Sequence, residues 1–378
     1  MDRVAAAGPE RHPGRLTPVE RLRIAQIAPL FESVPPRLYG GTERVVAYLV
    51  DALTDLGHDV TLFASGDSHT RAKLHASRER ALRLDDTPCK SDIAAHLAML
   101  HDVFTRAADF DVLHFHTDLL HFPVFASLAS RCVTTLHGRL DIEDLAGAYR
   151  AWPAFRLVSI SDHQRRPLLR ANWAATVYHG MPLHAEAGPR PPGEYVAFVG
   201  RISHEKRLDR AIRIARRAGI PLRVAAKVDD ADARYFNETI EPLIDEPHVQ
   251  FLGELPEREK LALLEGAVAL LFPIDWPEPF GLVMIEAMSR GTPVIAWRCG
   301  SVPEVVDDGT TGFIVESEDA AVEACGRAAA LDRATIRRVF EKRFAAPVMA
   351  ARYVQVYADM IAADGGATSQ LAQARTAS

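Results

Sequence analysis

Residues 23–64 read RIAQIAPLFESVPPRLYGGTERVVAYLVDALTDLGHDVTLFA and carry the clearest indication of fold class in this chain. A short apolar run opens the segment and another closes it, and apolar side chains recur at helical spacing from Glu43 to Leu56. A strand, a helix and a second strand in this order form the unit from which parallel sheets are built. The same alternation continues to about residue 315, so the sequence predicts an α/β protein.

The alternation is interrupted once, between residues 181 and 193, where four prolines and two glycines stand without any periodic pattern. We expect six strands before this break and six after it. Their predicted ranges are 23–29, 59–64, 111–116, 132–136, 156–160, 175–178, 195–199, 222–228, 249–252, 268–273, 293–297 and 312–315.

The break therefore predicts two domains of ordinary size joined by a linker. A helix after the last strand is long enough to pack back across the linker onto the first domain. The expected division is a flexible tail over 1–20, a first domain over 21–180, the linker over 181–193, a second domain over 194–346, the returning helix over 347–364 and a flexible tail over 365–378.

Composition excludes several classes of protein. The 378 residues are 48% hydrophobic and carry a net charge of −6, which fits a folded protein and argues against a general electrostatic grip on nucleic acid. No apolar run is long enough to cross a membrane, and the first 20 residues lack the apolar core of a secretory signal. The cysteines have neither disulfide-framework nor zinc-ligand spacing, so a reducing, cytoplasmic setting is expected; they are Cys89, Cys132, Cys299 and Cys325.

The segment WPEPFGLVMIEAM, residues 276–288, carries two acidic side chains in unusual surroundings. Glu278 precedes a proline, which disfavours helical backbone and predicts an extended loop, whereas Glu286 falls inside the following helix. Gly281 allows close approach of a ligand, and the helix N-terminus suits a phosphate group. A carboxylate buried among the apolar neighbours of Glu286 needs a partner, which ligand hydroxyls can supply. The alternative is a solvated loop acid followed by a paired helix residue.

Two further loops follow the first strand of each predicted domain. The loop LYGGTER, residues 38–44, places Gly40 and Gly41 at a helix N-terminus, where backbone amides can face an anion. The loop VGRISHEKRL, residues 199–208, offers Arg201 and Lys206 as two cations that complement a diphosphate. The residues alone leave open a tight turn for the first loop and solvated cations for the second.

Histidines cluster near the ends of two predicted strands. His114 and His116 alternate to one face of a strand, but no third ligand has convincing spacing, so a metal site is the less favoured interpretation. His137 stands at a strand end before a glycine and is the better candidate for contact with a small ligand. A histidine that caps a turn is the alternative.

In combination, several motifs resemble the retaining glycosyltransferases of family 4. They are EPFGLVMIEAM from 278, YGGTERV from 39, GRISHEKRLDRAI from 200, TLHG from 135, GSVPE from 300 and DGTTGF from 308. The resemblance covers residues 21–357 and implies the GT-B fold, with two Rossmann-like domains whose parallel sheets face a central cleft. It also implies transfer of a hexosyl group from a UDP- or GDP-sugar to an acceptor hydroxyl, with retention and with neither a metal nor another cofactor.

The resemblance further implies a role for individual residues. Catalytic roles fall to Glu278, His137, Arg201 and Lys206. Donor binding falls to Gly40, Gly41, Arg201, Lys206, Val228, Leu252, Leu255, Glu278, Phe280, Gly281, Leu282 and Glu286. Of these, Val228, Leu252 and Leu255 mark the backbone groups expected to hold the base. Acceptor-side candidates are His116, Asp118 and His137. Residues 226–229, AKVD, replace a Gly-x-Gly turn common in the family, which leaves open whether Lys227 takes part in donor binding.

Two other functions are compatible with the same residues. A sugar-nucleotide epimerase can share the GT-B architecture, and a non-catalytic protein can retain a nucleotide-sugar site. The expected partners are a nucleoside diphosphate sugar and a hydroxyl acceptor, without nucleic acid, and the residues do not identify that acceptor as lipid, saccharide or metabolite. Arg165, Arg166 and Arg170 can contact an anionic membrane surface, although a solvated basic face is the favoured interpretation.

Overall fold

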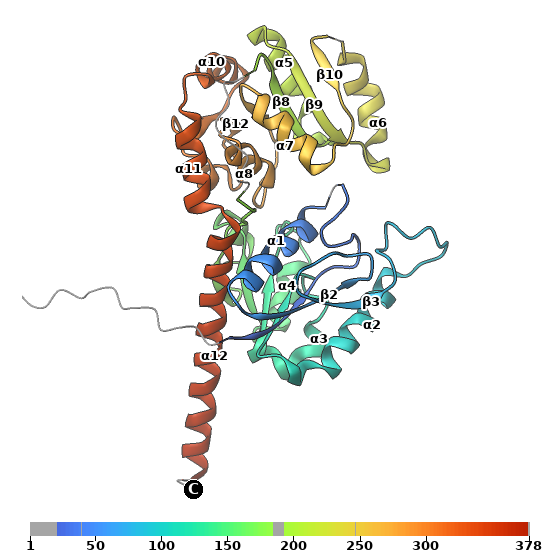
Figure 1. The fold of residues 1–378 in the computed structure, drawn as a ribbon, viewed down its shortest axis with the longest axis vertical. Coiled ribbons are helices and arrows are strands. Elements are labelled where there is room, and N and C mark those ends of the chain that lie inside the picture. The colour runs from blue at the N-terminus through green and yellow to red at the C-terminus, as the bar shows by residue number, and fades with distance from the viewer. Residues whose placement is uncertain (1–20, 39, 184–192, 246, 377–378) are drawn as a thin grey trace, which may run out of the picture.

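The computed structural model describes residues 21–38, 40–183, 193–245 and 247–376. Two domains, each with a parallel sheet at its centre, are stacked along the long axis of the molecule (Figure 1). The expected tail over 1–20 and residues 184–192 of the expected linker lie outside the described residues. The α/β class and the two parallel sheets predicted from the sequence are confirmed.

The first sheet has seven parallel strands in the order β3-β2-β1-β4-β5-β6-β7. One of them, β3, was not expected from the sequence, because this edge strand is half exposed and lacks an apolar run. The last strand, β7, begins two residues earlier than predicted. The strands are β1 Arg23–Ile27, β2 Asp59–Ser65, β3 Lys73–Arg78, β4 Val112–Phe115, β5 Cys132–Thr135, β6 Arg156–Ser159 and β7 Trp173–Thr176.

The second sheet has six parallel strands in the order β10-β9-β8-β11-β12-β13. In each sheet the strand order reverses at one point, between β1 and β4 and between β8 and β11. Ligands of open α/β sheets bind beyond the carboxyl ends of the strands at such points. The strands are β8 Val196–Arg201, β9 Leu222–Lys227, β10 Val249–Phe251, β11 Leu270–Phe272, β12 Val294–Trp297 and β13 Gly312–Val315.

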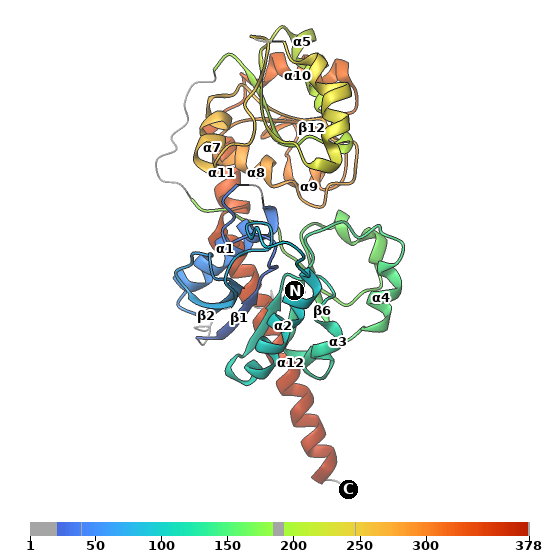
Figure 2. The same ribbon diagram turned by 90° about the vertical axis from the view of Figure 1, so that its right-hand side faces the viewer.

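Helices cover both sheets (Figures 1 and 2). Helix α1 forms because its valines and leucines recur at helical spacing and bury one face against the first sheet. The helices are α1 Gly41–Asp55, α2 Asp92–Thr105, α3 Phe122–Phe125, α4 Leu145–Ala151, α5 Leu208–Ala218, α6 Ala233–Tyr235, α7 Glu257–Gly266, α8 Leu282–Ser289, α9 Val302–Val305, α10 Glu318–Ala328, α11 Arg333–Arg343 and α12 Ala346–Thr376.

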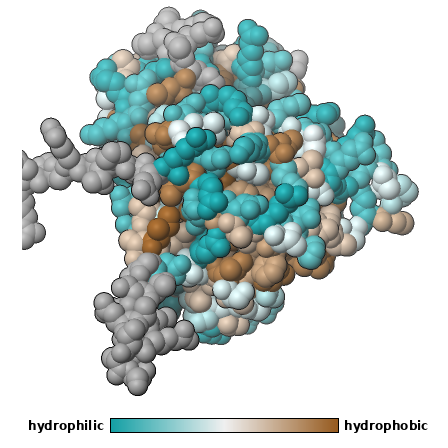
Figure 3. Space-filling model, turned by 60° about the horizontal axis from the view of Figure 1, so that its bottom comes forward, coloured by the Kyte–Doolittle hydropathy of each residue, from teal (hydrophilic) through white to brown (hydrophobic). Residues whose placement is uncertain are grey.

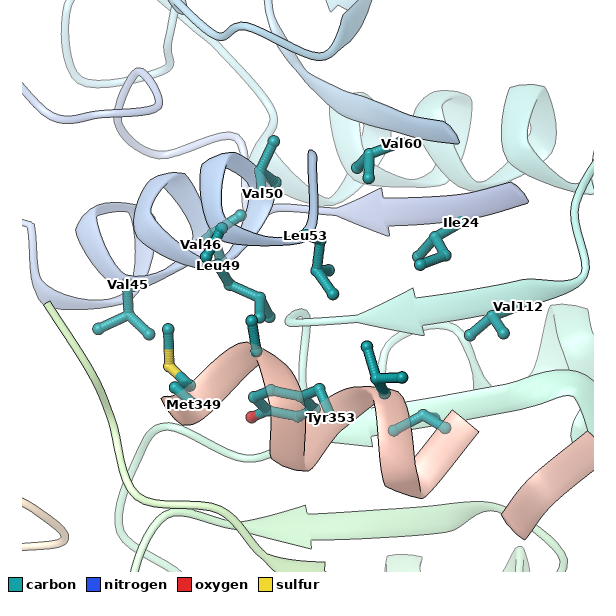
Figure 4. Close-up of a cluster of buried hydrophobic side chains, with 14 of the residues drawn as sticks. Ile24, Val45, Val46, Leu49, Val50, Leu53, Val60, Val112, Met349 and Tyr353 are labelled. Carbon is teal, nitrogen blue, oxygen red and sulfur yellow. The ribbon is translucent and has the colours of Figure 1, made fainter. Parts of the chain in front are cut away.

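Helix α12 returns from the second domain and packs on α1 of the first. Its residues Met349 and Tyr353 lie in one apolar cluster with Val45 and Leu49 of α1 and Ile24 of β1 (Figure 4). The sequence predicted a flexible tail from residue 365, but α12 continues through Thr376 and projects beyond the first domain (Figure 1). Alanine, glutamine, leucine and arginine in this segment are compatible with a helix, and they outweigh the turn-like glycines at 365 and 366.

Within the described part of the chain, no helix combines the length and the apolar character needed to span a membrane. The end of the first domain remote from the second shows apolar patches between hydrophilic ones (Figure 3). The large apolar side chains of α2 that are exposed are Ile93, Leu97 and Phe104. All four cysteines are free thiols.

Candidate functional site

A cavity of about 710 Å³ lies between the two domains, at the carboxyl ends of both sheets. The first domain lines it with the loops that follow β1, β4 and β5, and the second with the ends of β8 and β9 and the loop between β11 and α8. Both points of strand-order reversal therefore open onto the same space. Its volume is typical of a site for a small ligand.

Two helix N-termini from different domains meet at this cavity. Helix α1 begins at Gly41, and a Cβ atom at that position would lie 3.5 Å from Cδ1 of Leu282, the first residue of α8. The preceding Gly40 has no room for a side chain, since its Cβ would lie 2.7 Å from Cβ of Pro36. The first N–H groups of a helix lack intrahelical partners and carry partial positive charge. Their convergence makes the cavity suitable for an anionic group.

Glu278 forms a buried ion pair at the edge of the cavity. Its side chain accepts a hydrogen bond from Nζ of Lys206 and a second from Nε1 of Trp276, at 3.0 Å. The Lys206 ammonium also lies 4.9 Å from the centre of a Trp276 ring. Both contacts engage Oε2 of Glu278, so Oε1 has no protein hydrogen-bond partner among the described residues. The pair thus offers a ligand one carboxylate oxygen and one cation.

The loop that carries Glu278 packs directly against the turn at Gly300. This glycine has a φ of +58°, and a Cβ there would lie 2.4 Å from both the backbone N and O of Glu278. The N–H of Ser301 donates to the Glu278 carbonyl at 3.0 Å, and its hydroxyl donates to the Phe280 carbonyl at 2.8 Å. Residues 300 and 301 therefore position the acidic loop, a role that the sequence did not reveal.

Arg201 and Lys227 add positive charge on the second domain's side of the cavity. Arg201 ends β8 and forms ion pairs with Glu205 at 3.3 Å and with Asp229 at 3.6 Å. Lys227 ends β9, lines the cavity and pairs with Asp229 at 2.9 Å. Arg201 and Lys227 thus share one carboxylate, and a ligand phosphate can compete with it for either cation.

Glu286 and Glu257, both on helices of the second domain, line the cavity and take part in ion pairs. Glu286 of α8 is buried and accepts a hydrogen bond from Nζ of Lys260 at 2.5 Å. Glu257, the first residue of α7, pairs with Arg44 and accepts a hydrogen bond from the hydroxyl of Tyr48 at 2.5 Å. Arg44 and Tyr48 belong to α1, so these contacts join the two domains beside the cavity.

The histidines form a hydrogen-bonded group in the first domain. His116 bonds to Nε2 of His137 through Nδ1 at 2.9 Å and to Oε1 of Gln26 through Nε2 at 2.8 Å. The His137 ring stacks on that of His179, with ring centres 5.2 Å apart. Burial lowers the pKa of His137 to about 3, so this side chain is neutral near pH 7.

The ring nitrogens of His114, the other half of the conceivable metal pair, are both hydrogen-bonded. They contact the Tyr357 hydroxyl at 2.8 Å and the Thr135 hydroxyl at 2.7 Å. Over the part of the chain that the structure describes, no group of three or more His, Cys, Asp or Glu side chains is arranged to hold a metal ion.

Glu43 is a buried acid in the first turn of α1 that also lines the cavity. Burial raises the pKa of its carboxyl to about 7, and the nearby carboxylate of Glu32 adds to the effect. The side chain therefore exchanges between its protonated and ionised forms near neutral pH.

Most of the residues predicted from the sequence lie at this cavity. Val228 and Leu252 do not line it. The side chain of Val228 packs against the apolar core of the second domain, and that of Leu252 is 42% exposed. The predicted residues that line the cavity are Gly40, Gly41, His116, Asp118, His137, Arg201, Lys206, Leu255, Glu278, Phe280, Gly281, Leu282 and Glu286.

Gln26, Lys260 and Arg44 are among the polar contributors that the sequence analysis missed. Gln26 interrupts an otherwise apolar strand, and this interruption was a usable signal. Lys260 and Arg44 carry no comparable signal, because charged residues at helical positions are usually solvated. Only the folded chain shows that Lys260 meets the buried carboxylate of Glu286 and that Arg44 meets the partly exposed one of Glu257.

Comparison with known families covers most of the chain in two parts. Residues 39–181 match the model of the family described as Glycosyltransferase Family 4, and residues 183–338 match that of Glycosyl transferases group 1. The two matches divide the chain at the same place as the two sheets.

Two curated relatives and one solved structure match over most of their length. Phosphatidyl-myo-inositol mannosyltransferase of Mycolicibacterium smegmatis is 26% identical over 338 residues, covering 82% of this chain and 84% of the relative. Glycogen synthase of Mycobacterium tuberculosis is 28% identical over 363 residues, covering 79% and 84%. The crystal structure of AviGT4, a glycosyltransferase involved in avilamycin A biosynthesis, has a TM-score of 0.68 and 24% identity and covers 90% and 98%.

The close packing at Gly300 predicts that two glycine variants differ in their free energy of unfolding. Both glycines adopt a left-handed conformation, so an alanine is strained at either position. Gly300→Ala also brings a Cβ atom into the Glu278 backbone, whereas a Cβ at Gly309, where φ is +75°, would have no atom within 4 Å. Urea unfolding should show Gly300→Ala to be less stable than Gly309→Ala by about 2 kcal/mol. Equal losses would show that the loop tolerates the extra atom.

The raised pKa of Glu43 predicts a pH-dependent effect of Glu43→Gln. Above pH 7 the folded protein bears the cost of a buried charge, and as the pH falls through 7 toward 4.5 the carboxyl is protonated and this cost disappears. Glu43→Gln should therefore raise the free energy of unfolding above that of the wild type, and this increase should be about 2 kcal/mol larger at pH 8 than at pH 5. Glu259→Gln, at the equivalent but exposed position of α7, is the control and should show no such pH dependence. A gain equal at both pH values would contradict the assignment.

Proposed function

Because the chain belongs to the family 4 glycosyltransferases with the GT-B fold, we propose that it moves a hexosyl group from a UDP- or GDP-sugar to an acceptor hydroxyl, with retention and without a divalent metal. The observation that carries this proposal is the meeting of two helix N-termini with Lys206, Arg201 and the buried Glu278 in one cavity between the domains. The names of the two relatives, a mannosyltransferase and a glycogen synthase, favour a hexose as the transferred group.

The donor diphosphate is proposed to lie between the N-termini of α1 and α8. Backbone amides at Gly41 and Leu282 approach from the two domains, and Lys206 and Arg201 bring positive charge from the second. Such groups stabilise negative charge as it develops on a leaving diphosphate. Cations and helix amides then do what a divalent metal does in other sugar-transferring enzymes, which is the basis for proposing a metal-independent reaction.

The remainder of the donor is assigned to the two buried acids. Glu278 has one carboxylate oxygen available for a sugar hydroxyl, and it lies next to the α8 N-terminus. Glu286 is proposed to bind the ribose hydroxyls, with Lys260 holding its carboxylate in place. His137, from the first domain, is proposed to face the transferred sugar.

The proposed reaction breaks the bond between the anomeric carbon and the diphosphate oxygen and forms a bond from that carbon to the acceptor oxygen on the same face. The acceptor's proton passes to the leaving phosphate oxygen. The protein's part is to hold the two substrates and to stabilise the separating charge, which are the effects that accelerate such a step.

A donor screen tests this proposal. Incubation with UDP- and GDP-hexoses should reveal slow hydrolysis or transfer with one of them, with the anomeric configuration kept and with the rate unchanged by EDTA. An inverted product or loss of activity with the chelator would contradict the mechanism. A rearranged nucleotide sugar formed without acceptor would instead identify an epimerase, and tight binding without turnover on a broad acceptor panel would identify a non-catalytic protein.

The role of the cations predicts a large kinetic effect of Lys206→Ala. Loss of this charge beside the diphosphate should lower the transfer rate by about a hundredfold or more. The exposed Lys73 of β3 offers a control, and Lys73→Ala should leave the rate unchanged. Arg201→Ala should behave like Lys206→Ala, with thermal unfolding measured in parallel. Normal turnover in both site variants would remove these residues from the assigned role.

A further inference from the structure

A chain of buried hydrogen bonds connects the cavity with helix α12. It runs from His137 through His116 and Gln26 to the hydroxyl of Tyr357, and each step is 2.8 to 3.1 Å long. Gln26 and Tyr357 are fully buried, on β1 and on α12. Gln26 and Tyr357, 331 positions apart in sequence, are thus linked by hydrogen bonds to His137, which lines the cavity.

The direction of each hydrogen bond follows from what each atom can donate. Oε1 of Gln26 only accepts, so Nε2 of His116 must carry the proton that it shares with this oxygen. Burial, together with the neighbouring imidazoles, holds the pKa of His116 well below its usual value, so the ring is neutral and Nδ1 is a lone pair. That lone pair requires His137 to donate from Nε2.

The remaining nitrogen of His137 is then an acceptor. With its single proton on Nε2, Nδ1 of His137 carries a lone pair, and this atom is buried without a hydrogen-bond partner in the described part of the protein. A histidine in this state accepts a hydrogen bond from a hydroxyl group and cannot donate one to a phosphate. The opposite tautomer would present an N–H group at the same position.

The orientation of the Gln26 amide decides between the two tautomers. A flipped amide would donate to Nε2 of His116. His116 would then carry its proton on Nδ1 and donate to His137, whose own proton would lie on Nδ1. The contact between Nε2 of Gln26 and the Tyr357 hydroxyl is 3.1 Å, a length typical of N–H···O bonds, whereas O–H···O bonds are usually shorter. Tyr357 in turn contacts Nδ1 of His114 at 2.8 Å, so its hydroxyl can accept from Gln26 and donate to His114.

We propose that Gln26 and Tyr357 are positioning residues that fix His137 in the tautomer whose Nδ1 accepts a hydrogen bond from a hydroxyl of the bound sugar. This proposal rests on the proposed transferase function for the identity of that ligand. It makes α12 part of the active site, although the helix itself does not line the cavity.

Helix α12 provides a matched control. Tyr353, one turn before Tyr357, is also fully buried, and its hydroxyl contacts that of Thr135 at 2.8 Å, at the far end of the same network. Tyr353→Phe and Tyr357→Phe each remove one buried hydroxyl from one helix. Only Tyr357→Phe removes the hydroxyl that accepts a hydrogen bond from the Gln26 amide nitrogen and so sets the orientation of that amide.

The test measures both the tautomer and the kinetics. Nitrogen-15 NMR of histidine-labelled protein should show His137 with its proton on Nε2 in the wild type and in Tyr353→Phe, and a mixture of tautomers in Tyr357→Phe. For Tyr357→Phe, kcat should fall about tenfold, the effect of one misdirected hydrogen bond, while KM for the donor changes less than kcat. Tyr353→Phe should keep kcat near the wild-type value despite a similar loss of thermal stability.

Equal kcat and equal tautomer populations in the two variants would overturn the proposal, as would a His137 that carries its proton on Nδ1 in the wild type. The NMR measurement needs no turnover and can be made even on a variant of low activity. If the wild type turns over no nucleotide sugar, the proposed function fails, and the tautomer populations alone decide the positioning role.

Discussion

The buried ion pair between Lys206 and Glu278 organises the second domain's half of the cavity. It joins the loop after β8 to the loop after β11, on the two sides of the point where the strand order reverses. Removing one partner of such a pair leaves an uncompensated buried charge, so both residues are held in place together. Gly300 and Ser301 fix the backbone beneath Glu278, and α8 begins four residues later. The position of one helix N-terminus thus depends on one pair of charges.

The other half of the cavity depends on contacts between the domains. Arg44 and Tyr48 of α1 share the carboxylate of Glu257 on α7. On the opposite side, the carboxylate of Glu304 accepts hydrogen bonds from the backbone N–H groups of Asp162 and His163, each at 2.7 Å. Together with α12, these contacts set the relative position of two sheets that share no strand. The N-terminus of α1 faces that of α8 only in this arrangement.

Sequence patterns were sufficient for the fold class, and most of the site residues that they predicted lie at the cavity, because such patterns are local. Apolar runs specify buried parallel strands, and glycine-rich or charged loops after strands must lie at one edge of a sheet. The edge strand β3 was not predicted, because its half-exposed residues form no apolar run. The last turns of α12 were not predicted as helix, because their composition resembles that of a linker.

Partnerships between distant residues could not be predicted from the sequence. Gln26 and Tyr357, or Arg44 and Glu257, come together only through the packing of whole domains, and nothing near either residue identifies its partner. For Val228 and Leu252 the family resemblance pointed to backbone groups, and the positions of their side chains, one against the core and one exposed, do not test that expectation.

Calorimetric titration of the protein with UDP and GDP, each compared with its own nucleoside, tests whether the convergent helix N-termini and cations form a diphosphate site. At least one diphosphate should bind about a hundredfold or more tightly than its nucleoside, because several charge-assisted hydrogen bonds depend on the phosphates. Equal affinity for diphosphate and nucleoside, or no binding of either diphosphate, would contradict it.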